Sequence, residues 1–112
     1  MFIQGKQPCL IIPKRLHKAF QHALTGLGYE SHDGPRWKRD GETQTWVVAL
    51  GNGRQIHVQE EELSNGNVAV FAHTEPAGFG PRHLASALRD EASFSGGSKA
   101  LKADLRKRGW QF

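Results

Sequence analysis

The chain has 112 residues, of which 38% are hydrophobic, and a formal net charge of +4. That length fits a single domain (1–112) with one core, and no apolar run approaches the ~18 residues of a membrane-spanning helix. Cys9 is the only cysteine, which excludes an intrachain disulfide. With no signal-peptide pattern at Met1–Lys6, we expect a cytoplasmic protein that has no contact with a membrane.

The charges fall into three blocks. Residues 1–40 contain seven basic and three acidic residues. Residues 41–75 contain one basic and five acidic residues, and residues 76–112 contain seven basic and three acidic residues. A basic surface attracts polyanions at long range. The same segregation would also hold basic flanks against an acidic centre, so both interpretations stay open at this point.

The clearest helix follows Pro13. Apolar residues recur at helical spacing from Leu16 to Leu27, and Gly26 or Gly28 ends the pattern. The short apolar run before it, 8–12, predicts a buried strand or an extended lead-in. The opposite side of the helix is either a solvated surface or a binding surface for nucleic acid or an acidic partner; it carries Lys14, Arg15, His17, Lys18, Gln21 and His22.

The middle of the chain predicts an antiparallel β-meander. Strands are expected at 43–50, 55–62 and 67–74, and a short strand at 36–39 would make a fourth. Asn52-Gly53 and Asn65-Gly66 are typical of two-residue hairpin loops. Two-residue loops pair Val48 with His57 and Val58 with His73, which puts the two histidines on opposite faces.

That register sorts the side chains into two faces. One face would carry Val47, Ala49, Ile56, Val58, Ala69, Phe71 and His73, and the other Trp46, Val48, Leu50, His57, Gln59, Val68, Val70 and Thr74. The second face mixes polar and apolar groups, so it predicts a seat for a C-terminal helix, a dimer interface or a ligand pocket. Its candidate partner or ligand residues are Trp46, Val48, His57, Gln59 and Val70.

Two helices are expected after the sheet. The first would begin at Pro81 and continue to Ala92, and the small residues of 93–97 would end it. Ser98 would then cap a last helix that reaches Arg108. Aromatic Trp110 and Phe112 predict a docked C-terminus. The predicted fold is therefore α+β: an N-terminal helix, a three- to four-stranded antiparallel meander and two C-terminal helices.

A basic stripe along the last helix suggests a function. Lys99, Lys102, Arg106 and Lys107 share one side of it and, together with Lys14, Arg15 and Lys18, predict a non-enzymatic nucleic-acid-binding protein. The order of helix, three strands and helix, with Gly97-Ser98-Lys99 and Lys102 opening the last helix, resembles the layout of double-stranded-RNA-binding domains. That resemblance implies that these lysines contact phosphates. Trp37 and the additional residues 76–95 depart from the family pattern.

Two other classes of function stay open. The mixed sheet face predicts a protein-interaction module that forms a homodimer or binds a partner or small ligand. His57 or His73 would serve a third possibility, an enzyme or ligand binder. Ser95–Lys99 would be a phosphate-binding turn or an ordinary helix break. No His-Glu-x-x-His pattern or cysteine pair occurs, so no metal, cofactor or catalytic residue is predicted.

Overall fold

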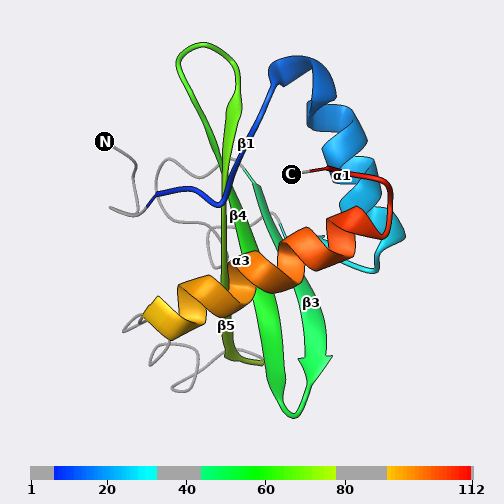
Figure 1. Ribbon diagram of the computed structural model, residues 1–112, viewed down its shortest axis with the longest axis vertical. Helices are drawn as coiled ribbons and strands as arrows, with labels where there is room; N and C mark the ends of the chain where they lie inside the picture. The colour runs from blue at the N-terminus through cyan, green and yellow to red at the C-terminus, as the bar shows by residue number, and fades with distance from the viewer. Residues whose placement is uncertain (1–6, 33–43, 78–90, 112) are drawn as a thin grey trace.

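The computed structural model describes residues 7–32, 44–77 and 91–111. Within these ranges it contains one antiparallel five-stranded sheet and two α-helices, α1 and α3 (Figure 1). This confirms the α+β class, with more strands than predicted. The strand order is β1-β5-β4-β3-β2. The strands are β1 (Leu10–Ile12), β2 (Glu30–His32), β3 (Gln44–Gly51), β4 (Arg54–Glu62) and β5 (Val68–Pro76).

The three long strands match the predicted meander, and two short strands extend it. β1 pairs with Val68–Val70 at the start of β5, which confirms the strand interpretation of the apolar run at 8–12. β2 pairs with Thr45–Val47 of β3 and was not predicted, because its sequence Glu-Ser-His has low strand propensity. The strand predicted at 36–39 lies outside the described residues.

The first helix forms where the apolar periodicity placed it. A 3-10 turn (Lys14–Leu16) leads into α1 (His17–Gly26), which buries Phe20, Ala23 and Leu24. Gly28 has φ +92° and ends the helix, because its backbone turns there so that the Tyr29 N–H donates back to the Leu24 carbonyl at 3.0 Å.

The last helix corrects the prediction. α3 (Glu91–Arg106) is continuous through residues 93–97, where a break was expected, and the start predicted at Ser98 is wrong. Gly97 lies against β5 so closely that a Cβ there would come within 2.5 Å of the His73 Cα. Gly97 therefore permits close helix–sheet packing, which offsets its helix cost of about 1 kcal/mol. The helix expected from Pro81 lies outside the described residues up to residue 90.

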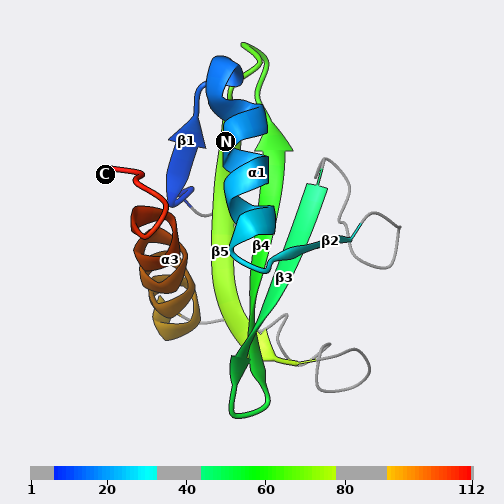
Figure 2. The same ribbon diagram turned by 90° about the vertical axis from the view of Figure 1, so that its right-hand side faces the viewer.

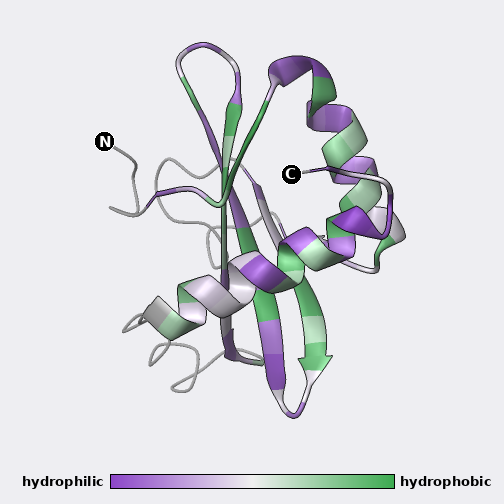
Figure 3. Cartoon of the chain, in the orientation of Figure 1, coloured by the Kyte–Doolittle hydropathy of each residue, from purple (hydrophilic) through white to green (hydrophobic). Residues whose placement is uncertain are grey.

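α1 covers one face of the sheet and α3 lies along β5, and side chains from both helices help to enclose the core (Figures 1 and 2). In Figure 3, hydrophobic and hydrophilic positions alternate along both helices, as expected when one side of each helix is buried. The docked C-terminus is confirmed for Trp110, whose ring meets Phe20 edge-on at 6.0 Å. The central core residues are Ile12, Phe20, Leu24, Trp46, Ile56, Val58, Val68, Val70, Leu101 and Leu105.

The predicted strand registers are each wrong by one residue. A β-bulge between Ala49 and Gly51 shifts the pairing of β3 with β4. The second hairpin has a three-residue loop, because Leu63 N–H donates to the Asn67 carbonyl at 2.8 Å and Gly66 adopts φ +87°. Relative to β3 and β5, each side chain of β4 therefore lies on the opposite face of the sheet from the one predicted.

The corrected faces differ in composition. The face under α1 carries Trp46, Val48, Ile56, Val58, Val68, Val70 and Ala72, and the opposite face carries Val47, Ala49, Gln55, His57, Gln59, Phe71, His73 and Glu75. Neither helix in the described part of the chain is long and apolar enough to cross a membrane.

Candidate functional site

The five residues predicted to form one partner or ligand surface are divided between the two faces. Trp46 and Val70 belong to the buried core, and Val48 packs against it. His57 and Gln59 lie on the opposite face. These five residues cannot act as one surface, because β4 has the opposite orientation from the predicted one. The homodimer itself stays a prediction, which sedimentation of the full chain tests.

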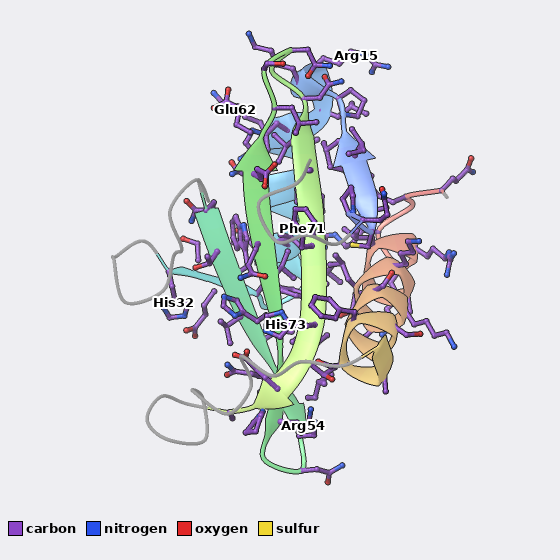
Figure 4. The ribbon with its side chains drawn as sticks, turned by 90° about the vertical axis from the view of Figure 1, so that its left-hand side faces the viewer. Arg15, His32, Arg54, Glu62, Phe71 and His73 are labelled. Atoms are coloured by element: carbon purple, nitrogen blue, oxygen red, sulfur yellow. The ribbon has the colours of Figure 1, made fainter. Side chains whose placement is uncertain are left out.

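The polar face brings together His57, His73 and Glu75, which we call the histidine–glutamate cluster. His57 on β4 pairs directly with His73 on β5, and the ring centroids lie 5.0 Å apart. Glu75 is two residues beyond His73 on the same strand, so its side chain shares that face. Figure 4 shows this face toward the viewer, with His73 beside Phe71 on β5 and α1 behind the strands. All three cluster residues are at least 96% buried.

Glu75 is the centre of the cluster. Its Oε1 accepts a hydrogen bond from His73 Nε2 at 2.5 Å, and its Oε2 accepts one from Gln55 Nε2 at 2.6 Å. His57 Nδ1 lies 3.6 Å from Oε2. Burial by itself raises the pKa of Glu75, but hydrogen bonding and attraction to His57 and His73 outweigh it and hold this pKa well below its usual range. Glu75 is therefore a carboxylate at neutral pH.

A pocket of about 300 Å³ lies next to the cluster, between β5, the segment before β1 and α3. Phe94 of α3 lines it and also approaches the His73 ring, with centroids 6.1 Å apart. Cys9 lines the same pocket, and burial raises its pKa to about 11 despite the nearby Lys102 and Ser98. The Cys9 thiol is thus protonated at neutral pH and is not an activated nucleophile.

A second buried carboxylate lies under α1. Glu60 is fully buried and accepts hydrogen bonds from Trp46 Nε1 at 2.6 Å and from Gln21 Nε2 at 3.3 Å. His17 Nε2 also contacts it. His17 and Gln21 were predicted on the outer side of α1, yet they point toward the sheet. α1 and β4 are therefore joined through His17, Gln21 and Glu60 and not through the lysines and arginines of the first basic block.

The predicted phosphate-binding cations divide into two groups. Lys14, Arg15 and Lys18 are exposed around the start of α1, whereas Lys99 and Arg106 are exposed on α3 and Lys107 is exposed just after it. Lys102 is half-buried and lines the pocket. Lys107 pairs with Asp104 at 3.4 Å. Among the residues that the structure describes, no ion pair involves Lys14, Arg15, Lys18, Lys99 or Lys102.

The two groups of cations are separated by the length of α1. The Arg108 guanidinium lies against Gly26, so the C-terminal ends of the two helices meet. Lys14, Arg15 and Lys18 are at the other end of α1. Residues 95–99, predicted as a phosphate-binding turn, lie in the interior of α3, so their backbone N–H groups are not at a helix start.

No protein-family model matches the chain, and searches of curated proteins and of solved structures found no match. The layout also departs from the double-stranded-RNA-binding pattern. β1 and β2 are additional to its three strands, and Lys99 and Lys102 lie well inside α3 rather than at its start.

Sequence reasoning missed the histidine–glutamate cluster. The signal for it was present, because His73-Thr74-Glu75 places two polar side chains on one face of a strand. Bringing His57 to the same face required the correct register of β4 with β5, which the predicted two-residue loop did not provide.

Proposed function

We propose that the protein binds nucleic acid without catalysis, through the exposed basic side of α3, with the start of α1 as a second contact. The observation that carries this proposal is that Lys99 on α3, and Lys14, Arg15 and Lys18 near α1, are exposed and make no ion pair with a described acidic residue. Charges that are not neutralised within the protein are the ones that attract phosphates and release their counterions.

The charge balance at the C-terminal half of α3 and just after it supports the same interpretation. Residues 99–111 contain five basic residues and one acidic residue, Asp104. The Asp104 carboxylate already accepts a hydrogen bond from the Tyr29 hydroxyl at 2.8 Å and pairs with Lys107. It is therefore held toward the protein and leaves a positive field on the outer side of the helix.

The chemistry of this surface favours contacts to the phosphate backbone over base recognition. Lysine and arginine dominate it, and between Lys99 and Arg106 the exposed residue is the small Ala103. Such contacts position a protein on a duplex or single strand but carry little sequence information. We expect binding that depends strongly on salt and weakly on sequence.

Fluorescence anisotropy with labelled duplex DNA, duplex RNA and single strands tests this proposal, in titrations that start at ~50 mM salt, where phosphate contacts are strongest. The informative variant is Lys99→Gln, because Lys99 is exposed on α3. Arg54→Gln is the matched control, since it also removes one exposed positive charge, but from the β3–β4 hairpin.

Loss of one phosphate contact in Lys99→Gln should lower the slope of log K against log salt by about 1, while Arg54→Gln leaves the slope unchanged. Adding Lys18→Gln to Lys99→Gln should weaken binding further. Two results would refute the proposal: no binding to any of the nucleic acids at the lowest salt, or an equal effect of the two single variants. Polyglutamate serves as a polyanion control, and equal affinity for it would also argue against nucleic acid as the partner.

A further inference from the structure

We infer that His57, His73 and Glu75 form a binding site for a divalent transition-metal ion of the zinc type. This inference is independent of nucleic-acid binding, since the cluster lies on the sheet face opposite α1 and uses none of the proposed phosphate contacts. It rests on the donor set, on the distances between the donors and on the residues that hold them in place.

The donor set is two imidazole nitrogens and one carboxylate. Zn²⁺ takes such ligands at ~2.0–2.2 Å, and two-histidine, one-carboxylate sets bind zinc with a water or substrate as the fourth ligand. One donor atom from each of the three residues lies within 4.8 Å of the other two. The distance from His57 Nδ1 to Glu75 Oε2 is 3.6 Å, close to the ~3.4 Å that separates two ligands of one tetrahedral ion at those bond lengths.

Metal binding replaces one hydrogen bond. His73 Nε2 and Glu75 Oε1 lie 2.5 Å apart and share a hydrogen. When an ion binds there, that hydrogen leaves as a proton to solvent, and the two atoms separate by about 1 Å to bind the metal instead. No oxidant or reductant is needed, and the charge of the bound ion is balanced in part by the Glu75 carboxylate.

The surroundings hold the donors in place. Gln55 Nε2 donates to Glu75 Oε2 at 2.6 Å, which fixes the orientation of the carboxylate in the way that outer-shell partners orient metal ligands. His57 and His73 are directly paired in the hydrogen-bonded ladder of β4 and β5, so their Cα positions are fixed by the sheet. Phe94 packs beside the His73 ring and adds an apolar wall.

Isothermal titration of the metal-free full chain with Zn²⁺, and with Co²⁺ followed by its visible absorption, tests the site. We expect one equivalent of each ion, with a cobalt spectrum typical of tetrahedral coordination. Glu75→Gln is the main variant, because it keeps the shape of the side chain and removes the anionic donor. It should weaken Zn²⁺ binding at least tenfold. Glu62→Gln, which removes an exposed carboxylate from the end of the same sheet, should bind Zn²⁺ as the unaltered chain does.

A second measurement does not depend on whether a variant folds. In the ¹⁵N spectrum of the six imidazoles of the unaltered chain, Zn²⁺ should shift the nitrogens of His57 and His73 and leave the exposed His22 unchanged. The inference is overturned if no Zn²⁺ binds, if the shifted resonances belong to other histidines, or if folded Glu75→Gln binds Zn²⁺ as tightly as the unaltered chain. In those cases the cluster is a hydrogen-bonded structural group only.

Discussion

His57 and His73 face each other across β4 and β5, with ring centroids 5.0 Å apart and ring planes inclined at 62°. This pairing exists because the β4–β5 loop contains three residues, so that Glu62 pairs with Val68. A loop one residue shorter would put the two rings on opposite faces. The position of Gly66, at φ +87°, therefore decides which polar groups share the sheet face opposite α1.

The contact between Gly97 and β5 predicts a large effect of a single methyl group. A Cβ at Gly97 would lie 2.5 Å from the His73 backbone, so Gly97→Ala must push α3 away from β5. We expect a loss of about 1–3 kcal/mol in the free energy of unfolding, measured by urea denaturation. Gly96→Ala is the matched control, since its nearest neighbour would be Thr74 Cγ2 at 3.8 Å. That variant should be neutral or stabilised by up to about 1 kcal/mol, and equal losses in both would contradict the packing explanation.

Because Glu60 is buried and Glu62 is exposed, we expect the same Glu→Gln substitution to affect stability differently at the two positions. Glu60→Gln keeps the volume but removes the charge that Trp46 Nε1 and Gln21 Nε2 donate to. It should cost about 1–3 kcal/mol of unfolding free energy, because hydrogen bonds to a charged group in the interior are replaced by weaker ones. The exposed Glu62→Gln should change stability by less than about 0.5 kcal/mol. A similar cost for both variants in guanidinium denaturation would show that burial of Glu60 does not matter.

The Cys9 thiol and the Tyr29 hydroxyl predict that the free energy of unfolding falls at alkaline pH. Burial raises the pKa of Cys9 to about 11, and burial with a hydrogen bond to Asp104 raises the pKa of Tyr29. Both folded-state pKa values lie above the unfolded ones. The stabilisation is therefore complete below pH 9 and is lost as pH rises toward 11. Unfolding free energies measured from pH 7 to 11 should fall above pH 9, with a shallower fall between pH 9 and 11 in Cys9→Ala. An unchanged slope in that variant would contradict this assignment.

The same environment predicts a slowly reacting thiol. Cys9 is half-buried in the pocket beside Phe71, and at pH 8 its thiolate fraction is about a tenth or less of that of an unperturbed cysteine. Alkylation with iodoacetamide should proceed at least tenfold more slowly in the folded chain than in urea. Comparable rates in the two conditions would mean that the thiol is exposed and unperturbed.

The sequence predicted candidate-site residues correctly only where all of them lie on one helix or strand. The exposed positions of Lys99 and Arg106 follow from helical spacing alone, and α3 confirms them. The histidine–glutamate cluster depends on how two strands pair. Asn65-Gly66 indicated a hairpin correctly, but the dipeptide does not reveal that Gly66 closes a three-residue loop. A one-residue difference in loop length changes the face of every side chain on the strand.

Local sequence patterns were enough to predict α1 and the three long strands. The apolar spacing between Leu16 and Leu27 specified α1. The Val- and Trp-rich run at 43–50 specified β3, and the Asn-Gly turns on either side of 55–62 marked β4 and β5. Such periods and turns depend on neighbouring residues only. Tertiary structure decided the continuity of α3 and the pairing of His57 with His73. Gly97 lies in the helix where it packs against β5, a strand that is distant from it in the sequence. The pairing of His57 with His73 depends on the length of the loop between β4 and β5, which the Asn65-Gly66 dipeptide does not reveal.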